Sequence, residues 1–223
     1  MEPGARNLII IIPHKQSIFY MSMLGTQYLG LGLLGAVRAV NIEKREHSYQ
    51  RNERNFGTVR RKTRYKYLTS SEPLTLDEEF EMQKRWLEDE DKCTFIILDQ
   101  PVYVATGNEI DAMVGDTNMF LHCSQGLIVA EIEIMIADES YRGKKRGWES
   151  IVLMLLYGVE TLNINKFCAK IKLDNAVSFR MFEKLGFREV ERSEVFHEVT
   201  LEKEASSDWI SWLHSELQSI IPN

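Results

Sequence analysis

The sequence has few of the residues that mark secreted or metal-binding proteins. It contains only three cysteines, at positions 93, 123 and 168, and none of them forms a Cys-x-x-Cys pair. Three cysteines cannot all pair with one another, so a disulfide framework is excluded and a reducing compartment is the simplest environment. The same spacing offers no zinc site. We therefore expect a cytoplasmic protein without a metal.

Long apolar runs are also scarce, and one stretch alone is long enough to cross a bilayer. Residues 16–37 carry no charged side chain, but they include glycines at 25, 30, 32 and 35 together with several Ser, Thr and Gln. Their mean apolarity is therefore modest for a membrane helix. Only Arg6 and Lys15 precede the run, which is a poor signal-peptide start. We expect an extension here and no membrane partner.

Charge divides the chain into two regions. Residues 1–66 carry 12 Lys and Arg against 4 Asp and Glu, whereas residues 67–223 carry 15 against 29. This asymmetry predicts a basic N-terminal extension over 1–66, a folded acidic domain over 67–204 and a C-terminal amphipathic helix over 205–223. Ten of the cations lie in residues 38–66. A solvated flexible run explains them best, with a polyanion-binding patch as the alternative, and we expect no nucleic-acid partner.

Periodicity from residue 67 onwards predicts a mixed α/β sheet with helices on both faces. A capping box over residues 75–78 predicts a helix that begins at Leu76. Apolar or alternating runs predict strands at residues 93–98, 113–121, 127–136, 166–171, 187–191 and 195–201. Helical periodicity predicts helices at residues 149–162, 176–185 and 208–220. Pro101 and Gly107 predict a loop after the first of these strands.

The stretch from Ala130 to Leu156 organises the rest of the chain. Alternating Glu and Ile predict a strand that ends at Ile136, and a basic turn with two glycines, Arg142–Gly147, leads into the helix predicted at 149–162. Free N–H groups at a helix start, its positive dipole end and nearby cations suit a phosphate group. The stretch therefore predicts a phosphate cradle.

Two motifs in this order resemble the GNAT superfamily of acetyl-CoA-dependent N-acetyltransferases. The first is Arg142-x-x-Lys145-x-Gly147, where the family's pyrophosphate loop reads Arg/Gln-x-x-Gly-x-Gly/Ala. The second runs from Asn175 through Ser178 and Phe182 to Gly186-Phe187. The likeness extends from about residue 67 to 201. It implies the acyl-CoA N-acyltransferase fold, acetyl-CoA as co-substrate and direct transfer of acetyl to an amine, with no covalent enzyme intermediate.

The resemblance also implies which residues contact the co-substrate. The main chain of the strand before the loop would bind the pantetheine arm, the loop would bind the pyrophosphate, and Asn175 would make a further contact. The expected set is Ile134, Met135, Ile136, Arg142, Gly143, Lys144, Lys145, Arg146, Gly147 and Asn175. Lys145 stands where the family has glycine, which costs backbone freedom if that position needs a positive φ.

A carboxylate near the same strand would take the proton of the attacking amine. Glu131 and Glu133 lie two residues apart and so share one strand face, where we expect the two like charges to raise the pKa of one of them. A solvated strand face explains the two residues equally well. Phe182 occupies the position where the family often has a tyrosine that protonates the leaving thiolate. Cys168 is more simply a small core residue than a nucleophile.

The family likeness implies a protein α-amine or lysine as acceptor, with tubulin or microtubules as a candidate partner. The acidic domain favours the approach of a cationic amine. An alternative from another class stays open: a catalytically weak GNAT-like scaffold that binds and stabilises a partner such as microtubules. Lys145 and Phe182 both favour that alternative, and the sequence makes no prediction of oligomeric state.

Overall fold

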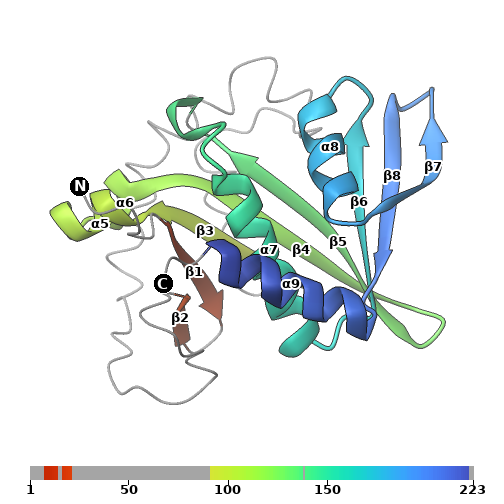
Figure 1. The fold of residues 1–223 in the computed structure, drawn as a ribbon, viewed down its shortest axis with the longest axis horizontal. Helices are drawn as coiled ribbons and strands as arrows, with labels where there is room; N and C mark the ends of the chain where they lie inside the picture. The colour runs from red at the N-terminus through yellow and green to blue at the C-terminus, as the bar shows by residue number, and fades with distance from the viewer. Residues whose placement is uncertain (1–7, 15–16, 22–90, 138, 221–223) are drawn as a thin grey trace.

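The computed structural model describes residues 8–14, 17–21, 91–137 and 139–220. Its strands are β1 (Leu8–His14), β2 (Ser17–Met21), β3 (Lys92–Asp99), β4 (Met113–Ser124), β5 (Leu127–Ile136), β6 (Lys166–Lys172), β7 (Arg188–Ser193) and β8 (Glu198–Glu204). Its helices are α5 (Gln100–Thr106), α6 (Glu109–Ala112), the 3₁₀ turn η2 (Glu139–Tyr141), α7 (Arg146–Glu160), α8 (Ala176–Lys184) and α9 (Ser207–Ile220). Figure 1 labels these elements along the ribbon.

The strands form one eight-stranded sheet in the order β2-β1-β3-β4-β5-β6-β8-β7. Adjacent strands are antiparallel except for β5 and β6, which run parallel because α7 connects them as a crossover helix. The predicted mixed sheet is confirmed, and the six strands expected from residue 93 onwards are all present, with ends that match or shift by at most three residues. The sequence pattern predicts no strand in residues 1–66, but the structure has two there, β1 and β2.

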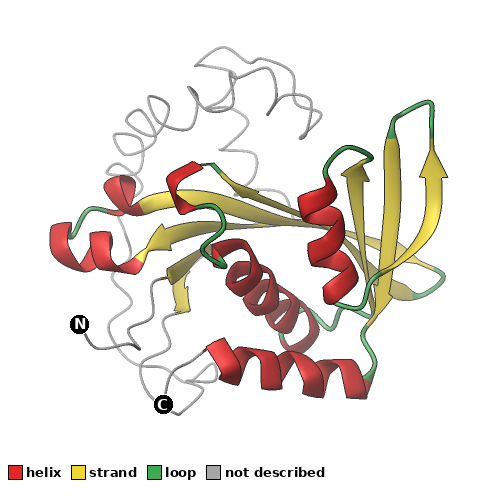
Figure 2. Ribbon diagram, turned by 45° about the horizontal axis from the view of Figure 1, so that its top comes forward, coloured by secondary structure: helices red, strands yellow, loops and turns green. Residues whose placement is uncertain are grey.

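One face of the sheet is covered by α7, α8 and α9, as Figures 1 and 2 show from two directions. The main hydrophobic core lies between these helices and the sheet. Its fully buried side chains include Phe95 and Met119 from the sheet and Ile151 and Leu155 from α7. On β5 the even-numbered residues face this core: Ala130 and Ile132 are buried in it, and Ile134 and Ile136 pack against it. The odd-numbered residues of β5 therefore point to the opposite face.

The C-terminal helix α9 is part of this core. Trp209, Leu213 and Leu217 are buried at the spacing that the sequence predicts for its apolar face. The Trp209 indole donates a hydrogen bond to the backbone carbonyl of Leu185 at 2.8 Å, and Trp212 meets Trp148 of α7 edge to face at 6.4 Å between ring centroids. The helix thus holds the crossover helix and the strands after it together.

The predicted loop around Pro101 and Gly107 is wrong, because α5 occupies it. Asp99 caps this helix by accepting a hydrogen bond from the Val102 N–H at 3.1 Å, and Gly107 ends it with φ +63°. Proline in the first turn and glycine just past the end are favourable at these two positions. The residues that predict a loop are here the two ends of a short helix. Helix α7 likewise begins three residues earlier than predicted.

Three predictions fall outside the described residues. The helix expected from Leu76 lies there, and so do the basic run 38–66 and most of the uncharged run 16–37. Among the helices that the structure does describe, none has the length and apolarity needed to span a membrane. Within the same residues no group of three or more His, Cys, Asp or Glu is arranged to hold a metal ion.

Leu213→Ala tests the role of α9 in the core. Leu213 is 0% exposed, so the substitution removes buried methyl groups and leaves a cavity. We expect the free energy of unfolding to fall by about 2–5 kcal/mol in urea denaturation. Gln218→Ala, at an exposed position of the same helix, is the control and should change it by less than about 0.5 kcal/mol. Equal effects of the two substitutions would contradict the packing described.

Candidate active site

The parallel strands β5 and β6 stay together for only a short distance. Their paired residues are Val129 with Lys166, Ala130 with Phe167 and Glu131 with Cys168. Figure 1 shows the strands side by side at the lower right and their C-terminal ends well apart. Among the described residues, the part of β5 from Ile132 to Ile136 has no strand on this side, although β4 pairs with it on the other. The sheet therefore contains an open strand edge in its interior.

The backbone groups of β5 alternate between this open edge and β4. The Glu133 carbonyl accepts a hydrogen bond from the Thr117 hydroxyl of β4 at 2.6 Å, and the Ala137 N–H donates to Val114 of β4 at 2.9 Å. Even-numbered residues therefore present their N–H and C=O to the β6 side. Ile134 and Ile136 have this orientation, whereas the main chain of Met135 faces β4. Of the three predicted pantetheine contacts, two point into the opening.

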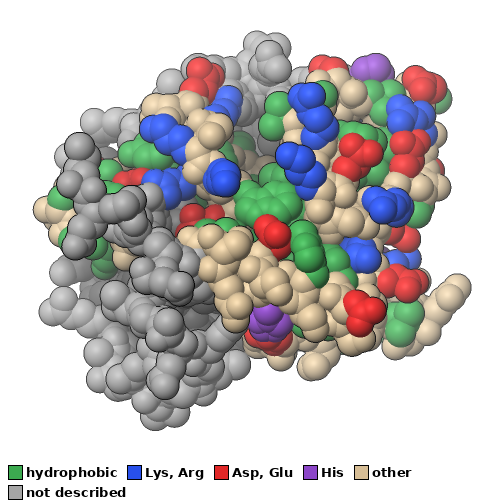
Figure 3. Space-filling view, in the orientation of Figure 1, with side chains coloured by type: hydrophobic (Ala, Val, Ile, Leu, Met, Phe, Trp, Pro, Cys, Tyr) green, Lys and Arg blue, Asp and Glu red, His purple; other side chains and the backbone are tan. Residues whose placement is uncertain are grey.

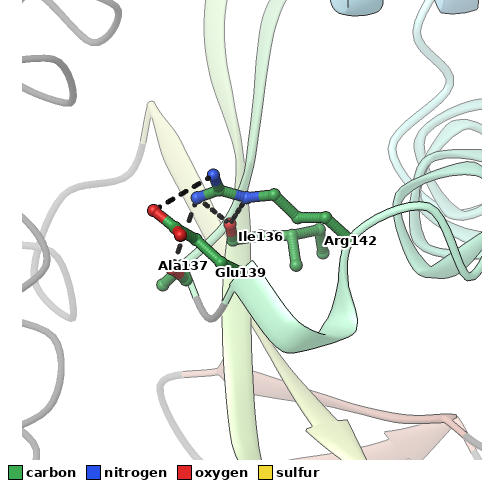
Figure 4. Close-up of polar contacts among 4 residues, drawn as sticks. All are labelled: Ile136, Ala137, Glu139 and Arg142. Carbon is green, nitrogen blue, oxygen red and sulfur yellow. Dashed lines mark hydrogen bonds and ion pairs between the residues drawn. The ribbon is translucent and has the colours of Figure 1, made fainter.

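The turn after β5 is tied to the end of that strand by Arg142. Its guanidinium donates from Nε and Nη2 to the Ile136 carbonyl, both at 2.9 Å, and from Nη2 to the Ala137 carbonyl at 3.3 Å. Glu139 lies 3.9 Å from the same group (Figure 4). Arg142 thus ties the loop to the carbonyls of Ile136 and Ala137 at the end of β5. Its side chain lies beside the opening.

Gly147, in the first turn of α7, lies where three elements meet. A methyl group at this position would lie 3.7 Å from Cδ1 of Ile134, 3.8 Å from Cγ1 of Ile136 and 3.8 Å from Sδ of Met181 in α8. The N-terminus of α7, the open edge of β5 and the helix α8 therefore converge at one point. The N–H groups of the first helical turn have no partner within the helix, so this point offers hydrogen-bond donors and a positive dipole end.

Lys145 adopts the conformation that the family's glycine would provide. It is the N-cap of α7 with φ +60° and ψ +7°, in the left-handed region, and its side chain makes no capping hydrogen bond. An L-residue pays about 1–2 kcal/mol for this conformation. The position does have a positive φ, which is the condition under which replacing glycine is costly, and the lysine is strained there.

Basic side chains surround the point of convergence. Figure 3 shows Lys and Arg gathered over the turn before α7 and over α8 on the same face. Lys144 and Lys145 are exposed in the turn, and Arg180 and Lys184 are exposed on α8. Arg146 differs from its predicted role as a surface cation, because its side chain is buried and forms an ion pair with Asp99 of β3 at 3.0 Å. What Arg146 offers to the turn is its backbone N–H.

The two predicted catalytic carboxylates lie on the sheet face opposite α7. Glu131 is at the last paired position of β5 and accepts a hydrogen bond from Lys170 of β6 at 2.7 Å, a contact that raises the pKa of Lys170. Glu133 is exposed one step further along the strand, beyond the point where β5 and β6 separate. The structure thus puts both carboxylates beside the opening, with Glu131 in an ion pair with Lys170.

The remaining predicted residues have clear local roles. The Asn175 side chain caps α8 by accepting from the Ser178 N–H at 3.3 Å. Phe182 is 3% exposed and packs edge to face on Phe187 with ring centroids 5.1 Å apart. Burial raises the pKa of the Cys168 thiol to about 11, so that Cys168, although it pairs with Glu131, is protonated at neutral pH and is not a nucleophile.

One polar cluster near the opening was not predicted from the sequence. Thr94 donates to the Asn118 side chain at 2.7 Å, and Asn118 in turn donates to Asp116 at 3.0 Å, with all three residues buried. Asn118 pairs with Glu133 across β4 and β5, so the cluster shares the face of the candidate base. The available signal is the polar run Asp116–Asn118, which interrupts the apolar residues of β4. Buried polar groups of this kind fix a unique arrangement when they are satisfied.

A family model for the acetyltransferase (GNAT) domain matches residues 45–188. The chain therefore belongs to the GNAT acetyltransferase family and is an acetyl-transferring enzyme. The matched stretch begins upstream of residue 66, and the domain boundary at 66 stays a prediction.

Within this family the chain is similar to N-acetyltransferase 9 proteins. It is 50% identical over 154 residues to the alpha/beta-tubulin-N-acetyltransferase 9 of Drosophila melanogaster, covering 67% of this chain and 77% of that one. It is 51% identical over 148 residues to the human protein of the same name, covering 66% and 72%. An N-acetyltransferase 9-like protein of Nematostella vectensis is 49% identical over 140 residues, with 62% and 71% covered.

Solved structures share the fold at low sequence identity. A spermidine N-acetyltransferase chimera from Vibrio cholerae and hSSAT has a TM-score of 0.54 at 18% identity, covering 74% of this chain and 93% of that one. An uncharacterized protein of Bacillus halodurans has a TM-score of 0.58 at 10% identity, covering 77% and 86%. Both neighbours establish the fold alone.

Lys145→Gly tests the strain in the turn. Glycine removes the cost of the left-handed conformation and adds a smaller cost in chain entropy, so the substitution should stabilise the fold by about 0.5–1 kcal/mol. Differential scanning calorimetry should show a rise in Tm of about 1–4 °C. Lys144→Gly removes the same charge from the neighbouring residue, which does not have a positive φ. Glycine relieves no strain there and only adds chain entropy to the unfolded state, so this variant should have a lower Tm. A fall in Tm for both variants would contradict the assigned strain.

Proposed function

We propose that this acetyltransferase uses acetyl-CoA and transfers its acetyl group by direct attack of a protein amine. The observation that carries the proposal is the open edge of β5 next to the first turn of α7. A pantetheine arm contains amides that can pair with the Ile134 N–H and C=O and with the Ile136 N–H, in place of a missing strand. The pyrophosphate would then reach the N–H groups at the start of α7 and the exposed lysines of the turn.

The two faces of the sheet give the two substrates separate approaches. Acetyl-CoA would enter from the face of α7, where the side chains of Ile134 and Ile136 also lie. The acceptor would approach from the opposite face, which carries Glu131 and Glu133. The two would meet in the opening between β5 and β6, so neither substrate has to leave before the other binds. The excess of acidic residues in the domain favours a cationic amine on this side.

The transfer itself needs one base and one donor to the thioester oxygen. The neutral amine attacks the thioester carbonyl carbon, the carbon–sulfur bond breaks and CoA leaves as the thiolate. We assign proton uptake from the amine to Glu133, directly or through water, because Glu133 lies on β5 just past the last residue that pairs with β6 and so borders the opening. A backbone N–H on the open edge would stabilise the oxyanion. Phe182 has no proton to give, so the thiolate takes its proton from water.

The acceptor we propose is a protein amine, with tubulin as the first candidate. The support is the name of the relatives, alpha/beta-tubulin-N-acetyltransferase 9, at about half identity. Tubulin is an intracellular protein partner, and we propose a cytoplasmic location with it. Two features would suit a catalytically weak scaffold on microtubules: the strained backbone at Lys145 and the phenylalanine at position 182. Such a scaffold would bind its partner without turnover, whereas an enzyme would release CoA.

Acetyl-CoA binding is tested by thermal shift with two substitutions at one glycine. Acetyl-CoA at 100 times its Kd should raise the Tm by about 5–10 °C, because it binds the folded state alone. Gly147→Glu should abolish the rise, since its carboxylate would project among Ile134, Ile136 and Met181. Gly147→Ala is the control and should keep it, because a methyl group there meets only ordinary contacts. A folded wild-type protein without any shift would overturn the proposed use of acetyl-CoA.

The base is tested by Glu133→Gln in a CoA-release assay with tubulin. We expect kcat to fall by about 10²–10⁴-fold while acetyl-CoA still raises the Tm. Glu191→Gln, at an exposed position of β7, is the charge-matched control and should retain activity. A larger loss in Glu131→Gln than in Glu133→Gln would move the assignment to Glu131. Wild-type binding without turnover would favour the scaffold.

A further inference from the structure

A buried ion pair joins the end of β3 to the first residue of α7. Nη2 of Arg146 lies 3.0 Å from Oδ2 of Asp99, and the two residues are 8% and 4% exposed. They are 47 positions apart in the sequence. Taking two charges out of water is expensive, and such a pair often adds no net stability compared with apolar residues. A buried ion pair at this place therefore needs a reason other than stability.

The Asp99 carboxylate holds the start of two helices at once. Its Oδ1 accepts from the Val102 N–H and caps α5, while its Oδ2 accepts from Arg146 in the first turn of α7. A negative charge is favourable near both helix N-termini. The arrangement fixes the first turn of α7 relative to β3, and β3 is bound through β4 to the open strand β5.

Arg146 itself is an unusual choice for the first residue of a helix. A cation is unfavourable next to the positive end of the helix dipole, and only the nearby carboxylate offsets it. Its buried Nε finds no hydrogen-bond partner among the described residues, so the guanidinium is held through Nη2 alone. The N-cap residue Lys145 contributes no side-chain hydrogen bond either. The contact with Asp99 is thus what anchors this end of α7 from the core side.

We propose that Asp99 and Arg146 are positioning residues that hold the first turn of α7 where it can bind the phosphates of the co-substrate. The inference rests on the proposed use of acetyl-CoA. The pair touches neither substrate, and its two charges compensate each other. The ion pair acts by fixing the position of the N–H groups of Arg146, Gly147 and Trp148. The open edge of β5, which would bind the pantetheine arm, does not depend on the ion pair.

Substituting Asp99 has two opposite effects on phosphate binding: loss of its negative charge favours binding, and loss of its contact with Arg146 disfavours it. The direction of the measured change therefore shows which effect is larger. Asp99→Asn removes one negative charge near the phosphate site, which alone would strengthen the binding of CoA. The asparagine can still cap α5 but loses its charge-assisted bond to Arg146. Positioning therefore predicts that Asp99→Asn weakens CoA binding, by about ten- to a hundredfold. Glu139→Gln removes one negative charge from an exposed residue of η2, just before the turn that leads into α7. This variant should bind CoA with equal or higher affinity.

The experiment measures Kd for CoA by calorimetry and for pantetheine, which has no phosphate, by ligand-observed NMR. Wild type, Asp99→Asn, Glu139→Gln and the double variant Asp99→Asn/Arg146→Met are compared. The double variant leaves no buried charge unpaired and so keeps the comparison valid if Asp99→Asn fails to fold. We expect both Asp99 variants to lose affinity for CoA and to bind pantetheine as wild type does.

The outcomes separate this inference from the proposed function. CoA affinity that is unchanged or higher in the Asp99 variants overturns the positioning role and leaves the use of acetyl-CoA intact. An equal loss for CoA and for pantetheine shows general destabilisation and also overturns it. A wild-type chain that binds neither compound overturns the proposed function together with this inference.

Discussion

The separation of β5 and β6 is the constraint on which the rest of the site depends. Parallel strands normally pair along their length, and backbone groups left without partners in an interior are costly. Here the pairing ends at Glu131 and Cys168, while β4 continues beside β5 to Ile136. The sheet therefore retains an unfilled strand edge, flanked by the N-terminus of α7. In an open sheet with a crossover helix, this is where a ligand is expected.

Two residues of the turn before α7 have a physical consequence, and one of them, Lys145, departs from the family pattern. Lys145 is forced into a left-handed conformation that glycine would adopt without strain. Arg146 brings a cation to the helix start, where the dipole disfavours it, and is turned inward to Asp99. Lys145 strains the turn and adds an exposed positive charge. Arg146 gives the helix start an ion pair in the core, where the N-cap residue makes no side-chain hydrogen bond. The ion pair of Arg146 thus holds the turn in place, while the strained backbone of Lys145 lowers the stability of the fold.

The strands and long helices could be predicted from the sequence because their apolar residues repeat with clear periods. Helix α5 could not, since it is only about two turns long and its proline and glycine also predict a loop. The start of α7 was predicted late because its first residues are basic and glycine-rich. Contacts across the fold were beyond prediction: Glu131 meets Lys170 from 39 positions away and Arg146 meets Asp99 from 47. Those contacts decide which predicted side chains remain available for binding.

Residue-resolved amide hydrogen exchange with and without CoA tests the open edge most directly. The alternation along β5 predicts that CoA slows exchange at the Ile134 and Ile136 amides, which face the opening. The Met135 amide faces β4 and should exchange at the same rate in both states. This odd–even difference is specific to a ligand that pairs with the strand edge. A uniform change over all three residues, or none while CoA is bound, would contradict the account.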